Sequence, residues 1–188
     1  EEYLKIPNVS PAYNASWEKD GHMHKVVNLY EKWAKENASK SATVFVQKIE
    51  GKTPLLVINV PARKYDGDDT VLLYGHLDKQ PEMVGWREGI EPWAPTYEGD
   101  RLYGRGSADD GYAMFSALIA INDLEDNDIS HPRQIVIIEA SEESGSPDLM
   151  DHLNLLNSSL EANSCEKLED VSLVVCLDSG ALSYEHLW

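Results

Sequence analysis

Cysteine, basic residues and long apolar runs are all scarce in this sequence, and each absence excludes a class of protein. Cys165 and Cys176 are the only cysteines, too few for a disulfide scaffold or a thiolate zinc finger. Lys and Arg number 16 against 33 Asp and Glu, so the formal net charge of -17 would repel nucleic acid and anionic membranes. No apolar run reaches the length of a transmembrane helix. We expect neither nucleic acid nor membrane as a partner.

The sequence also lacks an initial methionine and a recognisable signal peptide. It opens with Glu-Glu-Tyr-Leu-Lys, which has no apolar core of the kind that export signals carry. The low cysteine count favours reduced thiols in the cytoplasm, which is the expected location. A chain whose export signal has been removed is the alternative that the missing methionine leaves open.

The 188 residues are enough for one domain with a real core, and 42% of them are apolar. Apolar residues at helical spacing, and runs rich in β-formers, divide the chain into helices and strands. Helices are predicted over 16–36, 111–124 and 149–160, and strands over 43–49, 55–60, 70–74, 135–138 and 171–177. The strand over 135–138 is wholly apolar and that over 171–177 is apolar except for Ser172, a composition typical of strands buried on both faces. Helices alternating with buried strands predict a layered α/β domain.

Two segments place metal-ligating side chains at the ends of predicted elements. His76 and Asp78 follow an apolar strand two residues apart, so both point to one side. Asp109 and Asp110 lie among glycines just before a helix. Each segment has an ordinary interpretation as well, a local hydrogen bond for the first and a helix cap for the second.

Two further segments add carboxylates. Glu142 and Glu143 directly follow the strand over 135–138, and adjacent carboxylates repel unless a cation or a proton relieves them, although an exposed acidic loop would also explain them. Asp178 ends the last apolar run. Two zinc ions carry four positive charges; Asp109, Glu143 and Asp178 supply three negative charges, and Glu142 or a hydroxide the fourth. The pattern therefore favours a two-metal site.

Together the segments resemble the carnosinase-type dipeptidases, in the clan of two-zinc hydrolases that includes aminoacylase, the acetylornithine and succinyl-diaminopimelate deacylases, and carboxypeptidase G. The resemblance lies in Tyr-Gly-His76-Leu-Asp78-Lys-Gln-Pro, the insert from Trp86 to Pro95, and Leu-Tyr-Gly-Arg-Gly-Ser-Ala-Asp109-Asp110, with the Glu-Glu pair and Asp178 following in order. It implies a three-layer α/β/α zinc-peptidase catalytic domain with a mixed, largely parallel sheet.

The resemblance also implies a ligand set. His76 and Asp178 would hold one zinc, Glu143 would hold the other, and Asp109 would bridge the two. Manganese and cobalt are alternative metals for such a site.

Catalytic roles follow from the same resemblance. Glu142 would be the general base and Asp78 would orient His76. The family has a cis peptide after its bridging aspartate, so the bond between Asp109 and Asp110 is expected to be cis.

The implied activity is hydrolysis of the peptide bond of dipeptides or short peptides by a metal-bound hydroxide. The alternative is an N-acyl amino acid deacylase, acting on acetyl or succinyl groups with the same metals. Asp110 favours the dipeptidase, because the deacylases tend to carry methionine there. A non-catalytic metal-binding or interaction domain is the alternative from another class.

The sequence departs from the family in two places. Gly111-Tyr112 follows Asp110 where the family has Lys-Gly. The last zinc-binding histidine and the lid domain have no counterpart, since the remaining histidines are expected at the surface or at helix caps: His22, His24, His131, His152 and His186. Residues 1–188 are therefore expected to be the N-terminal portion of the catalytic domain, inactive or weakly active alone. The full-length protein is expected to form a homodimer through the missing lid.

Overall fold

The computed structural model describes residues 1–178, 180–183 and 186–187. The helices are η1 (Tyr3–Lys5), α1 (Trp17–Asp20), α2 (His22–Asn37), α3 (Ala113–Asp126), η2 (Glu142–Ser144) and α4 (Leu149–Ala162). The strands are β1 (Thr43–Gln47), β2 (Leu55–Val60), β3 (Thr70–His76), β4 (Thr96–Glu98), β5 (Arg101–Tyr103), β6 (Arg133–Glu139), β7 (Leu173–Cys176), β8 (Ala181–Ser183) and β9 (His186–Leu187). None of the helices in this part of the chain has both the length and the apolarity that a membrane span requires.

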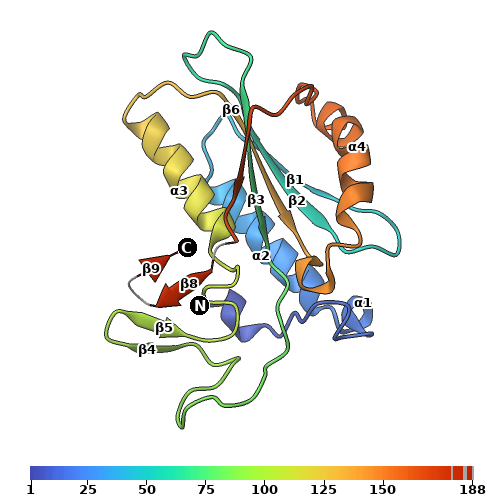
Figure 1. Ribbon diagram of the computed structural model, residues 1–188. Coiled ribbons are helices and arrows are strands. Elements are labelled where there is room, and N and C mark those ends of the chain that lie inside the picture. Colours follow the sequence, from blue (N-terminus) through green and yellow to red (C-terminus); the bar gives the residue numbers. More distant parts are fainter. Residues whose placement is uncertain (179, 184–185, 188) are drawn as a thin grey trace.

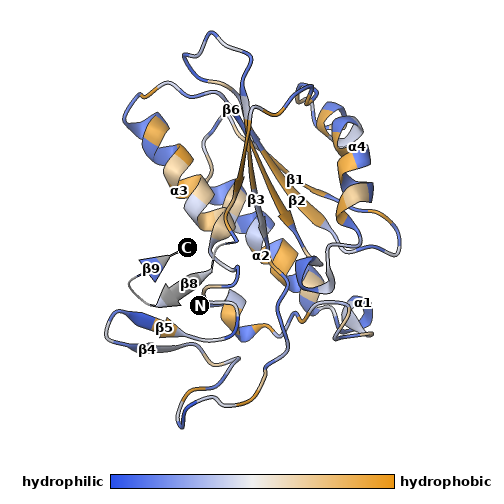
Figure 2. Cartoon of the chain, viewed as in Figure 1, coloured by the Kyte–Doolittle hydropathy of each residue, from blue (hydrophilic) through white to orange (hydrophobic). Residues whose placement is uncertain are grey.

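The elements form three layers around a five-stranded sheet of order β1-β2-β6-β3-β7. Helices α2 and α3 cover one face and α4 covers the other (Figure 1). In the middle strand β6, Val136 and Ile138 pack on the side of α2 and α3, whereas Ile135 and Ile137 pack on the side of α4. The strands of the sheet are apolar along most of their length (Figure 2). The predicted α/β layers, with a central strand buried on both faces, are confirmed.

The sheet is mixed, as predicted, and its directions determine where the strands end. β1 pairs with β2 and β2 with β6 in antiparallel directions, whereas β3 pairs with β6 and with β7 in parallel. Parallel pairing therefore makes up only the half of the sheet that contains β6, β3 and β7. The carboxyl ends of these three strands lie at one edge, where ligands collect in open α/β folds.

Two predicted elements differ from the structure. The helix expected over 16–36 is divided at Gly21, whose φ of 74° is left-handed and ends α1 before α2 begins. The prediction that residues 171–177 are buried is wrong, because Leu173 is 54% exposed and Val174 58% exposed. Their strand β7 lies at the edge of the described sheet, so an apolar sequence there does not bring burial.

The prediction of surface or capping histidines is wrong for His131 and His152, which are both buried. His152 Nε2 lies 2.7 Å from the Thr53 carbonyl, and its Nδ1 lies 3.0 Å from Gln47 Nε2. An imidazole whose two nitrogens both have partners can be buried at little cost. These partners come from a distant part of the chain, so no local pattern around His152 predicted them.

Candidate metal centre

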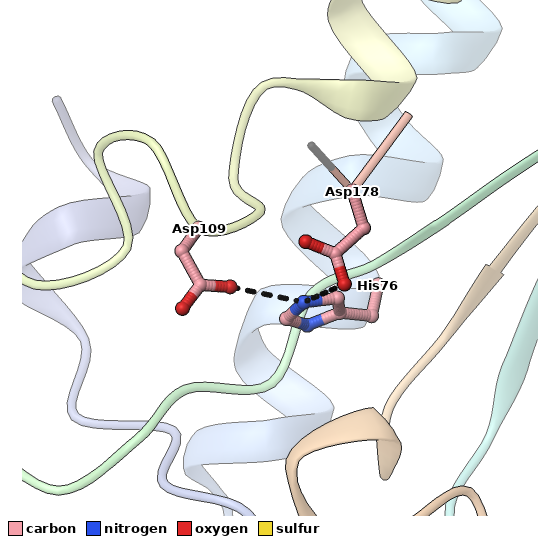
Figure 3. Close-up of side chains that lie close together, drawn as sticks. All are labelled: His76, Asp109 and Asp178. Carbon is pink, nitrogen blue, oxygen red and sulfur yellow. Dashed lines mark ion pairs between the residues drawn. The ribbon is translucent and has the colours of Figure 1, made fainter. Parts of the chain in front are cut away.

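His76 is the centre of a group of side chains at the carboxyl edge of the sheet. It is the last residue of β3 and is fully buried. Its Nε2 lies 3.2 Å from Asp109 Oδ1 and 3.7 Å from Asp178 Oδ2. Figure 3 shows both carboxylates directed toward the imidazole from separate segments. Three predicted site residues that are distant in the sequence therefore meet.

The two adjacent glutamates reach the same imidazole from the turn after β6. Glu142 Oε2 lies 3.9 Å from His76 Nε2. Single ligand atoms of His76, Glu142 and Glu143 all lie within 4.8 Å of one another. Ligand atoms of His76, Asp109 and Asp178 likewise all lie within 4.8 Å of one another. The structure thus places five potential ligands around one point, while their individual roles stay a prediction.

Asp78 lies behind the imidazole and is fully buried. Its Oδ1 is 3.4 Å from His76 Nδ1, on the side of the ring opposite to Nε2. The two carboxylate oxygens also accept the backbone N–H groups of Glu142 and Glu143, each at 3.1 Å. Asp78 therefore contacts the imidazole and the glutamate turn together, and this second contact was not foreseen from the sequence.

A close approach between β3 and the start of α3 brings Asp109 to the site. A Cβ at Gly75 would lie 2.4 Å from Ala113 Cβ and 2.6 Å from Asp110 Oδ2, so only glycine fits there. Asp110 Oδ2 accepts the backbone N–H of His76 at 3.0 Å. The peptide bond between Asp109 and Asp110 is cis, as the resemblance implied. Asp110 thus binds the backbone at the end of β3, while its neighbour Asp109 contacts the imidazole of His76.

The site carries perturbed protonation equilibria. Burial opposes the charged form of His76, but the contacts with Asp109 and Asp78 outweigh it and raise its pKa to about 11. The contact with His76 in turn lowers the pKa of Asp109. Burial, followed by repulsion from Asp109, raises the pKa of Glu143 to about 7, and burial also raises the pKa of Glu142. Carboxylates crowded in this way are relieved by a cation.

The donor set fits a metal ion. His76 Nε2 and Glu143 Oε1 are buried, and neither has a hydrogen-bond partner among the described residues. Buried polar atoms are nearly always paired, and these two lie within a cluster of carboxylates, so a bound cation would satisfy both. One imidazole nitrogen and several carboxylate oxygens are ligands that Zn²⁺ accepts, with Mn²⁺ or Co²⁺ as alternatives.

The N-terminal segment forms a support behind the site that the sequence did not reveal. Lys79 is fully buried, and its Nζ donates to the carbonyls of Tyr3 and Ile6 at 2.7 and 2.8 Å. Tyr3 Oη donates to the Leu77 carbonyl at 3.1 Å. Burial lowers the pKa of Lys79 to about 7. Because lysine is rarely buried, the sequence next to Asp78 did not predict that Lys79 would be buried and bound to the N-terminal segment.

By fold and donor set, this is an α/β/α domain of the metallohydrolase class. Residues 72–177, more than half of the chain, match peptidase family M20/M25/M40, and the chain belongs to that family. The resemblance found in the sequence is confirmed at this level.

Relatives of known sequence include both peptidases and deacylases. An uncharacterised metallohydrolase of Methanocaldococcus jannaschii is 26% identical over 74% of this chain and 34% of its own length. A Cys-Gly metallodipeptidase of Candida albicans is 39% identical over 47% of this chain and 18% of its own length. An acetylornithine deacetylase of Aliivibrio fischeri is 33% identical over 65% of this chain and 30% of its own length. The chain spans about a third or less of these relatives.

Solved structures share the fold. An M20 family metallo-carboxypeptidase of Sulfolobus solfataricus aligns with a TM-score of 0.72 at 22% identity, over 98% of this chain and 37% of that one. Human carnosine dipeptidase 1 aligns with a TM-score of 0.67 at 20% identity, over 94% of this chain and 37% of that one. The three-layer fold is therefore that of the family's catalytic domains.

Proposed function

We propose that these residues form the N-terminal part of the catalytic domain of a two-zinc dipeptidase, which hydrolyses the peptide bond of dipeptides or short peptides. The observation that carries the proposal is the buried Nε2 of His76, which has carboxylate oxygens of Asp109, Asp178 and Glu142 within 4 Å. Membership of peptidase family M20/M25/M40 and the similarity to a Cys-Gly metallodipeptidase support it. The lid domain, and a homodimer formed through it, stay predictions.

The proposed ligands divide between two ions. His76 and Asp178 would hold one, Glu143 would hold the other, and Asp109 would contact both. The short distances among the ligand atoms of His76, Asp109 and Asp178, all within 4.8 Å, support this division. When bound, the zinc pair supplies Lewis-acid polarisation of the scissile carbonyl and lowers the pKa of a water. Asp78 would keep the ring of His76 oriented, so that Nε2 faces the metal.

Glu142 is the proposed general base. Its carboxylate stands beside the ligand cluster, and burial raises its pKa, which makes the carboxylate a stronger base. It would take a proton from the attacking water and deliver it to the leaving amine. Glu143, its neighbour, would be occupied by the metal and could not take this role.

The substitution Glu142→Gln tests the proposal in the full-length protein. We expect turnover to fall by about 100-fold or more, because proton transfer is lost, while zinc content stays at the wild-type level. Steady-state assays and metal analysis measure the two quantities. Glu50→Gln, at an exposed glutamate in the turn between β1 and β2, is the matched control and should leave turnover unchanged. Retained turnover in Glu142→Gln would reject Glu142 as the general base, whereas a wild-type protein that binds zinc without any turnover would favour a binding domain.

A deacylase is the second candidate, favoured by the 33% identity to an acetylornithine deacetylase. Asp110 supports the dipeptidase, since its buried carboxylate accepts the N–H of His76, and the deacylases tend to carry methionine there. A panel of dipeptides assayed against N-acetyl and N-succinyl amino acids separates the two. Faster cleavage of the acyl amino acids would reject the dipeptidase.

A further inference from the structure

Glu139, the last residue of β6, is a buried carboxylate that the proposed chemistry does not use. It is 2% exposed. Its carboxylate accepts hydrogen bonds from Tyr74 Oη at 2.5 Å, Ser146 Oγ at 2.8 Å and Ser141 Oγ at 3.3 Å. A buried carboxylate costs free energy that neutral hydroxyl donors only partly offset, and an apolar residue would stabilise a core more simply. Fold stability alone therefore does not explain a carboxylate at position 139.

The serine hydroxyls that reach Glu139 stand at the two ends of the turn that carries Glu142. Ser141 precedes η2 and Ser146 follows it. The Ser141 carbonyl accepts the N–H groups of Ser144 and Ser146 at 3.1 and 3.0 Å, which closes the turn. Glu139 ties both ends of this closed turn to one point.

Glu139 also joins that turn to the strand of His76. Glu139 and His76 are directly paired where β6 runs parallel to β3, and these two strands lie side by side in Figure 1. The Glu139 carbonyl accepts the N–H of Leu77 at 2.9 Å. Tyr74, which supplies the third hydroxyl, lies on β3 as well. Backbone and side chain of one residue thus connect the imidazole strand with the glutamate turn.

We propose that Glu139 is a positioning residue that holds Glu142 in place beside His76. The inference rests on the proposed function, in which Glu142 transfers the proton. Glu139 is buried beneath the turn and acts through the hydroxyls of Ser141 and Ser146. A displaced base slows proton transfer, because that step requires hydrogen-bond reach, but substrate binding does not depend on it.

The substitution Glu139→Gln in the full-length, zinc-loaded protein tests this role. We expect kcat on a dipeptide substrate to fall about 10- to 100-fold, as is typical when a supporting partner is removed. KM should stay within about twofold of the wild-type value and zinc content should not change. Asp69→Asn is the matched control, because it removes the carboxylate of the exposed Tyr65–Asp69 pair. It should leave kcat unchanged.

Ser146→Ala removes one hydroxyl donor and keeps the test valid if Glu139→Gln does not fold. We expect kcat to fall about 3- to 10-fold, a smaller loss because two donors remain on Glu139. In the double variant, kcat should be no lower than in Glu139→Gln alone, since both residues act through the same contact.

Three results would overturn the inference: wild-type kcat in both single variants, fully additive losses in the double variant, or a loss of zinc or a rise in KM in place of the loss in kcat. Failure of the proposed function is recognised separately. If the full-length wild-type protein hydrolyses no dipeptide, the proposed function is wrong; if Glu142→Gln keeps its turnover, the role of Glu142 within it is wrong. If Glu142→Gln is inactive and Glu139→Gln is not, only the role of Glu139 is wrong.

Discussion

At the scale of single residues, Asp78 joins two parts of the site that are distant in the sequence. Asp78 and Glu142 are 64 residues apart. Its carboxylate contacts His76 on one side and accepts two backbone N–H groups of the glutamate turn on the other. Removing its charge would release both contacts together. The effect should therefore appear in metal binding.

We predict that Asp78→Asn weakens zinc binding by about 10- to 100-fold, the usual effect of losing a partner behind a metal ligand. The amide offers one acceptor oxygen where two N–H groups need one each. Competition with a chelator of known affinity measures the change. Asp148→Asn is the matched control, since Asp148 also accepts a backbone N–H, that of Thr53, which is not part of the cluster. Equal zinc affinities in all three proteins would contradict the prediction.

Lys79 leads to a prediction about pH. Burial lowers its pKa from the ordinary value of 10.5 to about 7. Between pH 7 and 10.5 the unfolded chain thus binds a proton that the folded chain has released, and the free energy of unfolding rises with pH. Below pH 7 both states hold the proton, and the folded state bears the full cost of the buried charge.

Lys79→Met removes this dependence and leaves the other titrating groups in place. Between pH 7 and 9, the free energy of unfolding of the wild-type chain should rise relative to that of Lys79→Met by up to about 1.4 kcal/mol per pH unit. Urea unfolding at several pH values measures the difference. A gap that stays constant over this range would show that the ammonium keeps its proton.

At the scale of elements, the packing of α3 against β3 determines where Asp109 stands. Gly75 allows this contact, because any Cβ would meet Ala113 and Asp110 at well under 3 Å. The sequence shows a glycine before His76 but gives no sign of what lies opposite. The need for glycine here comes from the approach of a helix that begins 38 residues later, at Ala113.

We predict that Gly75→Ala lowers the free energy of unfolding by about 1–3 kcal/mol, the typical cost of overpacking. It should also reduce zinc affinity, since Asp109 moves with the start of α3. Thermal unfolding and zinc titration measure the two effects. Gly104→Ala is the control, because its Cβ would meet no atom closer than 3.5 Å. Similar behaviour of the two variants would contradict the steric argument.

At the scale of the whole molecule, the sheet ends in an exposed apolar strand. Among the described strands β7 pairs only with β3, and its Leu173 and Val174 are more than half exposed. Exposed apolar edge strands are templates for pairing with another chain. The 188-residue protein should therefore self-associate as its concentration rises.

Leu173→Lys should suppress this association, because a charge on an edge strand opposes strand pairing. Light scattering over a range of concentrations measures the molecular mass. Ile119→Lys is the control, because Ile119 is 62% exposed on helix α3 and has no strand edge to pair, so its replacement should leave association unchanged. A wild-type protein that is monomeric at all concentrations would refute the prediction.

The sequence by itself determined the layers, most elements and the family. Apolar periodicity separates helices from strands because each element must bury one face or two, and the wholly apolar residues 135–138 were predicted as a central strand, which the structure confirms. It also supplied the side chains that approach His76, since strand ends of parallel strands meet at one edge. It failed at residues 171–177, because apolar composition records what a strand could bury and not whether a neighbour covers it.

Only the tertiary structure decided which groups support the site. The contacts of Asp78 with the glutamate turn, of Lys79 with the N-terminal segment and of Glu139 with its hydroxyls all join residues brought together by folding. Buried polar groups must find partners, but local patterning does not say which ones, because the partners lie on other strands and turns. The identity of each residue was visible in the chain, whereas its partner was fixed by the packing of the sheet and its helices.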